Sequence, residues 1–382
     1  MKESIMPVTG SHPLTIDNWQ SARAEGMINL QSIIPNLMTI NAQTVYRLNY
    51  QAINYDLHEI PSVARLLSHP AVAGLVVMKA SGEVLLEHYN NGNGHNTTFS
   101  IQSSTKAIGY LLLNRALKAG KISLDDKVEQ YIPEIGSGFW GRSVADVAAM
   151  AVHHNVAELA AYTGDPEAMV MYDRDERVIG LARNDEKETL RQFIEQIEAS
   201  GEAGSNQWQG KIANYATINT SVLGLMLENA MQVPLMAQVR VLLHEIGGEN
   251  PVHIGTDFEG APVIGAGMLM STVDFARYGR LLIADKEQVL SDREAASMHG
   301  ELVPADLTYV DSRYYKSAIH NEFGIGHSGW AGQLIWADPE SDIVIAMNGQ
   351  LASELPAPFD HFLKLYQGAI DIVKYFRSVP SL

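Results

Sequence analysis

The sequence contains no cysteine among its 382 residues. This absence excludes disulfide bonds, thiolate zinc sites and a cysteine nucleophile. No run of about eighteen apolar residues is present, so no segment is predicted to span a membrane. The first residues, 1–8, also lack the apolar core of a secretory signal, and we therefore expect a cytoplasmic protein.

Basic residues are scarce as well. The chain has 27 Lys and Arg against 44 Asp and Glu, a formal net charge of −17. Such an excess of negative charge argues against binding to nucleic acids or to anionic membranes. His153 and His154 are adjacent rather than one helical turn apart, and the carboxylates are scattered, with no pair that indicates a glycosidase. We therefore expect no metal and no cofactor.

The chain does contain enough apolar sequence for a large core. Hydrophobic residues make up 46% of it, which allows one large domain or two intergrown ones. Residues 1–65 are polar and interrupted by proline, and we expect an N-terminal arm packed on the body. Residues 66–103 and about 305–382 have strand patterns and predict a sheet domain, whereas residues 104–304 predict a mainly helical lobe.

Strands at both ends of the chain predict an α+β fold. In it, one antiparallel sheet flanked by helices carries an inserted all-helical lobe. The cleft between the lobes is the natural place for a ligand and for catalysis.

The segment 100–106 links a strand pattern to a long apolar helix pattern and contains Ser-x-x-Lys, with Ser103 and Lys106. If a helix begins at about Ser103, a spacing of three places both side chains on the same face. Ser103 then lies at the positive end of that helix, where backbone N–H groups favour an oxyanion, and the nearby amine can take the serine proton. The alternative is a helix-capping serine beside a solvated lysine. A lysine near the start of a buried helix is costly unless it is paired or functional, which favours catalysis.

A second group of polar residues, 214–220, follows the glycine-rich loop 201–210 and precedes an apolar helix pattern. Tyr215 at the end of such a loop can project into a cleft. To act as a base at neutral pH its pKa must fall by about three units from its usual value near 10, and the ammonium group of Lys106 favours that change. The alternative is a structural tyrosine that caps the helix through Asn219.

A third group, 326–333, is rich in small residues, which let a substrate approach the backbone closely. The backbone N–H of Trp330, on an edge strand facing the cleft, is a candidate oxyanion donor beside that of Ser103. His327 is a candidate donor to the substrate or to the phenol. The alternative is a glycine-rich strand that accommodates a neighbouring helix.

With its motifs in the order Ser-x-x-Lys, Tyr-x-x, His-x-Gly, the chain resembles the penicillin-recognising serine hydrolases. These include class C β-lactamases, D,D-peptidases, D-amino-acid amidases and related carboxylesterases. The resemblance runs from about residue 68 to 350 and looks closest to the 6-aminohexanoate-dimer hydrolases, with matches in 14–20, 171–174, 189–193 and 332–339. It implies a β-lactamase/transpeptidase-like fold.

The resemblance also implies roles for individual residues. Ser103 is the nucleophile, and Lys106 and Tyr215 share the proton transfers. The backbone amides of Ser103 and Trp330 form the oxyanion hole. Substrate binding falls to a further set of residues, namely Tyr172, His327, Gly329 and Asn219, with Tyr314 or Tyr315 as an aromatic lid.

Two positions depart from the β-lactamase pattern. The asparagine usual two residues after the tyrosine is Thr217, and the lysine usual in Lys-Thr-Gly is His327. Both departures disfavour recognition of a β-lactam carboxylate and leave acyl transfer from esters or amides intact.

The sequence therefore predicts a serine hydrolase that cleaves short amides or esters, of the 6-aminohexanoate-oligomer or carboxylic-ester type, through an acyl-enzyme on Ser103. The alternatives are a β-lactamase or D,D-peptidase, a D-amino-acid amidase, and a catalytically silent binding module of the same fold. The expected partner is a small-molecule amide or ester. The sequence leaves the oligomeric state open, with a homo-oligomer as one option.

Overall fold

The computed structural model describes residues 13–19, 23–50, 55–200, 212–304, 307–351 and 359–379. The glycine-rich loop predicted before Tyr215 and the start of the predicted arm lie outside these residues. The largest element is an eight-stranded sheet whose neighbouring strands are all antiparallel. Its strands follow the order β3 (Val84–Tyr89), β2 (Val72–Lys79), β12 (Ile343–Gly349), β11 (Gln333–Asp338), β10 (Gly324–Gly329), β9 (Ala318–Asn321), β8 (Arg313–Tyr315) and β7 (Glu301–Leu302).

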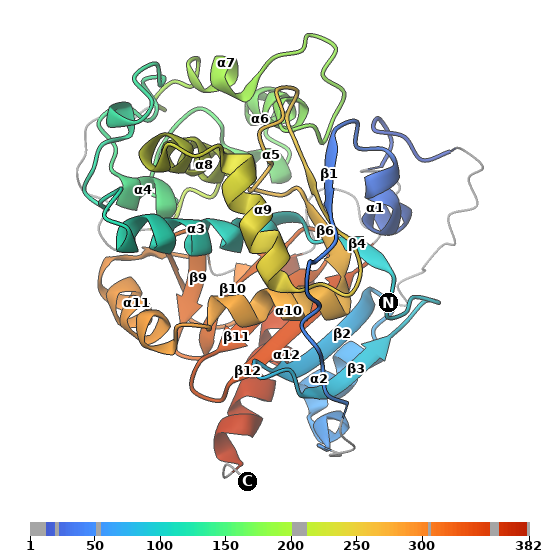
Figure 1. Cartoon of the computed structure of the whole chain (residues 1–382). Helices are drawn as coiled ribbons and strands as arrows, with labels where there is room; N and C mark the ends of the chain where they lie inside the picture. The colour runs from blue at the N-terminus through green and yellow to red at the C-terminus, as the bar shows by residue number, and fades with distance from the viewer. Residues whose placement is uncertain are drawn as a thin grey trace.

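The central strands are apolar on both faces because helices cover both. In β2, Val76 and Met78 belong to one apolar cluster, and the alternate residues Leu75 and Val77 belong to another. A period of two with burial on both sides produces the continuous apolar run that the sequence shows. Within this sheet, the strands that come first and last along the chain pair directly, since β2 lies beside β12, and Figure 1 shows the blue strand next to the orange-red ones.

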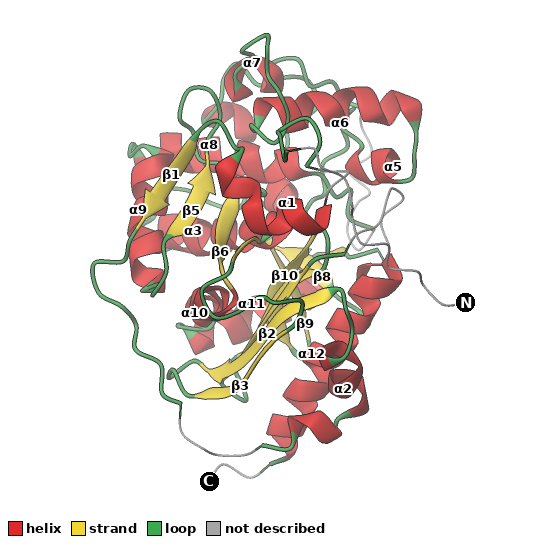
Figure 2. Cartoon of the chain, turned by 90° about the vertical axis from the view of Figure 1, so that its right-hand side faces the viewer, coloured by secondary structure: helices red, strands yellow, loops and turns green. Residues whose placement is uncertain are grey.

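Helices α10 (Thr272–Leu282) and α11 (Lys286–His299) pack on one face of this sheet. Helices α2 (Pro61–Leu67) and α12 (Phe359–Ser378) cover the opposite face, as Figure 2 shows. Apart from α1 (Arg23–Asn29), the remaining helices gather beyond one end of the sheet, in the upper half of Figure 1. They are α3 (Ala107–Lys118), α4 (Val144–Ala148), α5 (Glu158–Tyr162), α6 (Pro166–Val178), α7 (Leu190–Ile194), α8 (Thr217–Met231) and α9 (Leu235–Ile246).

A second, four-stranded sheet corrects the prediction of an all-helical insertion. Its order is β1 (Leu37–Ile40), β5 (Val252–Gly255), β6 (Met268–Ser271) and β4 (Thr98–Ser100). Strands β5 and β6 come from the segment expected to be helical, and β1 comes from the expected arm, which also contains α1 (Arg23–Asn29). These strands are only three or four residues long, so their patterns are too short to detect in the sequence.

The predicted α+β, β-lactamase/transpeptidase-like fold is confirmed, with antiparallel sheets flanked by helices. The boundaries between arm, sheet domain and helical lobe stay predictions. Among the described residues, no helix combines the length and apolar character needed to cross a membrane.

Candidate active site

Ser103 lies in a short 3-10 helix, η3 (Gln102–Lys106), which precedes α3. The expected helix start at Ser103 is therefore corrected: the α-helix begins four residues later, at Ala107. In a 3-10 helix, side chains three residues apart eclipse one another. Ser103 and Lys106 consequently still lie one above the other.

The chain is held tightly just before the serine. Gln102 has a φ of 48°, a left-handed conformation that is uncommon for a residue with a side chain. Its amide donates to Ser100 Oγ over 2.6 Å, and the N–H of Ile101 donates to Met268 O over 3.0 Å. These bonds tie the unusual residue and the residue before it to the small sheet, directly ahead of Ser103.

Lys106 is fully buried, and its ammonium has three hydrogen-bond partners: Ser103 Oγ at 2.9 Å, Thr217 Oγ1 at 2.8 Å and Gly265 O at 2.8 Å. None of the three is charged. Burial therefore lowers the pKa of Lys106 to about 8, although the carboxylate of Glu158 acts in the opposite direction. A lysine with this pKa can exchange protons near neutral pH.

Tyr215 approaches the serine from the other side. Its hydroxyl is 2.6 Å from Ser103 Oγ, and the Lys106 Nζ atom is 4.9 Å from its ring centre. Burial, and then the charge of Glu158, raise the pKa of Tyr215 well above 10. The expectation of a phenolate favoured by Lys106 is therefore wrong: the desolvated phenol stays protonated, and the lysine has the pKa suited to a base.

Glu158 connects these groups, and sequence reasoning missed it. Its carboxylate accepts from the N–H of Thr217, the first residue of α8, over 2.5 Å, and from Thr217 Oγ1 over 3.3 Å. It also accepts a hydrogen bond from Tyr162 OH. Because Thr217 also bonds Lys106, one chain of contacts runs from Glu158 to Ser103. A single glutamate in a five-residue helix carries no signal that would have marked it.

Asn219 does not reach the site. It is fully buried in α8, where its Oδ1 lies 3.4 Å from His154 Nε2 and its Nδ2 lies 3.4 Å from Met150 Sδ. The expected substrate contact is therefore corrected. The expected helix-capping role is absent too, because the capping carboxylate belongs to Glu158.

Strand β10 brings the glycine-rich segment against the serine turn. It lies inside the sheet rather than at the expected edge, but within the described chain β9 pairs only with Gly324–Gly326. The other half of the strand faces η3, where Ser104 Oγ donates to His327 O over 3.0 Å. The strand therefore approaches the turn that carries Ser103 through its backbone.

Gly329 makes this approach close. A Cβ atom at this position would lie 2.5 Å from Ile101 O and 3.1 Å from Ser103 N. Only glycine fits there without displacing the backbone that presents the Ser103 N–H. Trp330 follows directly after the strand, and its ring lies 5.3 Å from that of Tyr162.

Two pockets meet at the serine. The first encloses about 440 Å³ and is lined by Ser103, Leu159, Tyr162, Tyr215, Leu307, Tyr314, His327, Ser328, Gly329, Trp330 and Phe362. The second encloses about 560 Å³ and is lined by Trp19, Gln102, Ser103, Glu158, Tyr162, Met169, Tyr172, Glu176, Thr217, Ala266 and Trp330. An ester or amide bond at Ser103 therefore has open space on both sides.

Three tyrosines were predicted to bind or cover a substrate. Tyr172 lies on α6 and lines the second pocket, with its ring edge-on to that of Tyr162 at 5.4 Å. Tyr314 lines the first pocket and is 2% exposed, so it forms a wall rather than a mobile lid. Tyr315 lines neither pocket.

His327 lies in the first pocket but is not the donor that the sequence suggested. Its Nδ1 atom is 2.5 Å from the carbonyl oxygen of Ser328. A carbonyl oxygen only accepts, so Nδ1 carries the ring proton and donates it there. The neutral ring then has no N–H to offer to a substrate or to Tyr215.

Acidic residues near the second pocket were also missed. Glu176 lines it, and burial, followed by the charge of Glu158, raises the pKa of the Glu176 carboxyl to about 8. Asp175 is 1% exposed, and neither carboxyl oxygen has a hydrogen-bond partner among the described residues. Burial holds the pKa of Asp175 well above its usual range. In the sequence, both residues belong to a charged segment that indicates a solvated surface.

Trp19 shows that the N-terminal segment reaches the same pocket. Its side chain is 2% exposed, and its Nε1–H donates to Leu181 O over 2.8 Å. It lines the second pocket although it precedes Ser103 by more than eighty residues. No local pattern predicts such a contact. Within the described residues, no group of His, Asp and Glu side chains is arranged to hold a metal ion.

The model of the β-lactamase family matches residues 64–364. No curated protein matches the chain at a significant level. Among solved structures, a candidate 6-aminohexanoate-dimer hydrolase from Bacillus anthracis has a TM-score of 0.78 at 17% identity, covering 98% of this chain and 100% of that one.

Two other structures are similar over most of their length. A D-stereospecific amidohydrolase from a Streptomyces species has a TM-score of 0.54 at 16% identity, covering 81% of this chain and 97% of that one. An octameric penicillin-binding protein homologue from Pyrococcus abyssi has a TM-score of 0.53 at 18% identity, covering 83% and 78%. At these identities the comparisons show a common fold.

Proposed function

Because the chain belongs to the β-lactamase family, we propose that it is a serine hydrolase that cleaves short amides or carboxylic esters through an acyl-enzyme on Ser103. One observation carries the proposal. Ser103 Oγ lies between Lys106 Nζ at 2.9 Å and Tyr215 OH at 2.6 Å. A serine, a buried amine and a phenol within hydrogen-bond reach are the parts of a nucleophile with its proton relay.

In the first step, neutral Lys106 takes the Ser103 proton as Oγ attacks the substrate carbonyl. With a pKa of about 8, about a tenth of the lysine is unprotonated at pH 7. The lysine then holds the proton, and Tyr215, hydrogen-bonded to the same oxygen, relays it to the leaving atom. Water deacylates the serine by the same route in reverse. No metal or cofactor takes part in this proposal.

The negative charge on the carbonyl oxygen needs donors. We assign them to the backbone N–H groups of Ser103 and of Trp330, the residue directly after Gly329. A Cβ atom at Gly329 would lie only 3.1 Å from the Ser103 nitrogen, and this supports the assignment, because glycine keeps the space beside that N–H open. Donors held by the backbone need no rearrangement during the reaction.

The proposed substrates are short amides of the 6-aminohexanoate-oligomer type or carboxylic esters. The similarity to the Bacillus anthracis protein supports this class over the whole length of the chain. Thr217 accepts a hydrogen bond from Lys106, so it serves the lysine instead of a substrate carboxylate. We expect a cytoplasmic enzyme that acts on a small molecule.

Other activities of the family remain candidates. D-amino-acid amides are a second substrate class, because the structurally similar Streptomyces protein is a D-stereospecific amidohydrolase. β-Lactamase or D,D-peptidase activity has less support, since the position of the usual lysine carries the neutral, buried His327. A catalytically silent binding module would not require the short contacts at Ser103.

A fluorophosphonate probe tests the proposal, because it labels only an activated serine. We expect labelling of the wild-type protein at Ser103, with a rate that rises with pH through about 8 as Lys106 loses its proton. Ser103→Ala should abolish labelling, whereas the matched variant Ser104→Ala, one residue along the same turn, should retain it. Labelling that persists in Ser103→Ala would place the nucleophile elsewhere.

Parallel assays then identify the substrate class. They use nitrophenyl esters, 6-aminohexanoate dimer, D-amino-acid amides and nitrocefin. We expect ester and amide turnover and little hydrolysis of nitrocefin. A protein that neither labels nor hydrolyses any of them would be the silent binding module.

A further inference from the structure

His327, one of the residues that line the first pocket, has a buried ring nitrogen without a hydrogen-bond partner among the described residues. His327 is 1% exposed, and its Nε2 atom has no partner among the described residues. The other ring nitrogen, Nδ1, donates to Ser328 O. Nε2 therefore carries a lone pair and no proton.

The surroundings keep this nitrogen unprotonated. Burial, and then the positive charge of Lys106, lower the pKa of His327 to about 3. The described residues that line the pocket carry no carboxylate or other charged group that would stabilise an imidazolium. Nε2 is thus a neutral hydrogen-bond acceptor over the whole range in which Lys106 titrates.

Most of the side chains that line the first pocket are aromatic or aliphatic. The ring centre of His327 lies 6.2 Å from that of Tyr215 and 5.7 Å from that of Tyr314, and other walls come from Leu159, Leu307 and Phe362. Buried polar atoms in native proteins almost always have a partner, and an acceptor left without one is costly. The partner that fits here is a group of the ligand.

We propose that His327 Nε2 is a specificity-determining acceptor, and that the substrate arm in the first pocket carries an uncharged N–H or O–H donor close to the scissile bond. The proximity follows from Tyr215, whose hydroxyl bonds Ser103 Oγ and whose ring faces His327. A secondary amide or an alcohol meets this requirement. A carboxylate does not, because it offers only acceptors to a lone pair. This inference rests on the proposed function and specifies its substrate.

Matched esters test the acyl arm. N-acetylglycine 4-nitrophenyl ester has an amide N–H that O-acetylglycolic acid 4-nitrophenyl ester replaces by oxygen, with almost no change in shape. After division by the rates of hydrolysis by hydroxide, we expect the wild-type enzyme to favour the amide about ten- to hundredfold in kcat/KM, the usual effect of one buried hydrogen bond. A second pair, 3-(hydroxymethyl)phenyl acetate and 3-(methoxymethyl)phenyl acetate, tests the leaving arm.

Variants of His327 identify the acceptor. His327→Phe retains a ring without the nitrogen, and the preference should fall to near one. His327→Gln supplies a carbonyl oxygen as acceptor and should restore part of the preference. In the wild-type enzyme the preference should not change between about pH 6 and 9, because a neutral acceptor does not titrate there.

His320 provides a matched control. It is also 1% exposed, with Nε2 bonded to Tyr315 O and Nδ1 without a partner among the described residues, but it lines neither pocket at Ser103. His320→Phe should leave the preference unchanged. Fluorophosphonate labelling of each variant shows that the site is still folded.

The outcomes separate this inference from the proposed function. If no ester is hydrolysed and Ser103 does not label, the proposed function fails. If the esters are hydrolysed but neither pair shows a preference, only the role of His327 is refuted. A preference that survives in His327→Phe, or that disappears below about pH 7, would also refute a neutral acceptor at this nitrogen.

Discussion

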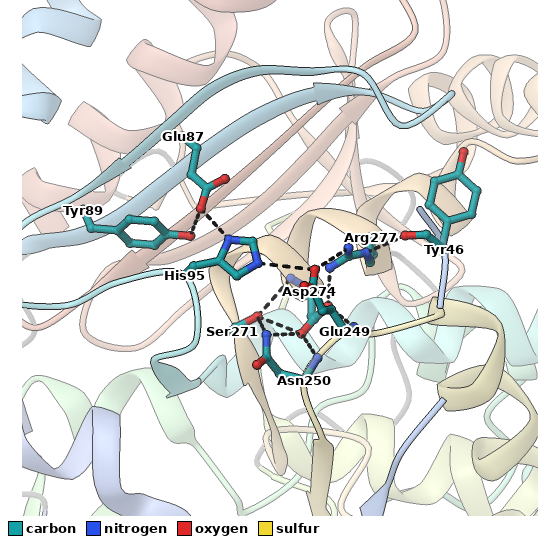
Figure 3. A network of polar contacts seen from close by, with 9 residues as sticks. All are labelled: Tyr46, Glu87, Tyr89, His95, Glu249, Asn250, Ser271, Asp274 and Arg277. Atoms are coloured by element: carbon teal, nitrogen blue, oxygen red, sulfur yellow. Dashed lines mark hydrogen bonds and ion pairs between the residues drawn. The ribbon is translucent and has the colours of Figure 1, made fainter. Parts of the chain in front are cut away.

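Two groups of buried charged side chains differ in how completely they are hydrogen-bonded. The first surrounds Asp274 at the start of α10 and is drawn in Figure 3. The second surrounds Lys106 beside the two pockets. The first group pairs its charges with donors and opposite charges, whereas the second leaves carboxyl oxygens without partners among the described residues.

Asp274 is fully buried and accepts from four residues. Its Oδ1 accepts from Arg277 over 2.6 Å and from the N–H of Glu249 over 2.9 Å. Its Oδ2 accepts from Ser271 Oγ over 2.8 Å and from Asn250 over 3.0 Å. Arg277 bonds Glu249 as well, over 3.1 Å. This network ties α10 to the loop that enters the small sheet.

By contrast, the buried ammonium of Lys106 is not paired with an opposite charge among the described residues. The lysine has three neutral partners, and the nearest carboxylates shift its pKa without touching it. Asp175 has no hydrogen-bond partner for either oxygen within the part of the chain that the structure describes. The comparison indicates that full pairing serves stability, whereas incomplete pairing keeps a lysine and carboxyl groups with shifted pKa values around the pockets at Ser103.

The largest expected effect is a loss of hydrolytic activity when residues of the Lys106 group are changed. Ser103→Ala should reduce hydrolysis about a million-fold, because the nucleophile and its relay act as one unit. The protein should stay folded, with a change of no more than about 1–3 kcal/mol in the free energy of unfolding, because Lys106 and Tyr215 lose one hydrogen-bond acceptor. Steady-state kinetics and urea unfolding measure the two quantities. Lys106→Ala should cost nearly as much activity, and the double variant scarcely more; losses that multiply would contradict a shared relay.

Tyr215→Phe removes only a hydroxyl and should affect amides more than activated esters. An amine must be protonated to leave, whereas nitrophenolate leaves without a proton, so the loss should be about a hundred- to ten-thousand-fold for amides. The KM should change little if the phenol acts mainly in the transition state. Kinetics on a matched amide and nitrophenyl ester measure this. Equal small losses on both would reduce Tyr215 to a structural role.

The fully paired group should respond in stability. Asp274→Ala leaves Arg277, which is 1% exposed, without its buried partner. We expect a loss of about 3–5 kcal/mol in the free energy of unfolding. Urea unfolding measures it, with Lys118→Ala as control: its ion pair with Asp285 is more than half exposed on both sides and should contribute less than about 1 kcal/mol. Similar effects of the two variants would contradict a stabilising role for the buried pairing of Asp274.

Asp175→Leu should do the opposite and stabilise the fold. Its raised pKa means that the unfolded chain ionises first, so the folded state is penalised increasingly as pH rises above about 4. We expect a gain of about 1–3 kcal/mol at pH 8 and little gain near pH 4. Urea unfolding at both pH values tests this. Asp173→Leu, an exposed position on the same helix, should change stability by less than about 0.5 kcal/mol at either pH.

The smallest expected effect on stability concerns His95, at the partly exposed side of the Asp274 group. His95 bonds Glu87 over 2.7 Å and Glu249 over 3.3 Å (Figure 3). Although burial lowers it, these bonds leave the pKa of His95 above 6.5. Its stabilisation is therefore present below about pH 6.5 and is lost as pH rises through the folded pKa.

His95→Phe should accordingly lower the melting temperature slightly at about pH 6 and hardly at all at pH 9, by less than about 1 kcal/mol in free energy. Thermal unfolding at the two pH values measures the difference. An effect that grows with pH would have the wrong sign for a protonated histidine between two carboxylates.

Much of the fold was predictable because it rests on local patterns. The strand patterns at both ends of the chain predicted the antiparallel sheet, and the long apolar pattern after residue 106 predicted α3, although its start was expected at Ser103 and lies at Ala107. The small sheet was not predictable, since strands as short as β4 have no period to detect. Its partners also come from distant parts of the chain.

The sequence by itself determined which residue types stand at the candidate site: Ser103 and Lys106 at a spacing of three, and Tyr215 and His327 in their order. Only the tertiary structure decided what those residues can do. Packing brings Glu158 onto Thr217 and Trp19 beside the serine, and it buries Lys106, Tyr215 and His327. Burial and the charges of residues distant in the chain set the pKa of Lys106. The hydrogen bond from His327 Nδ1 to Ser328 O decides that Nε2 keeps its lone pair. Those quantities depend on distances between residues far apart in the chain, and a linear sequence does not contain them.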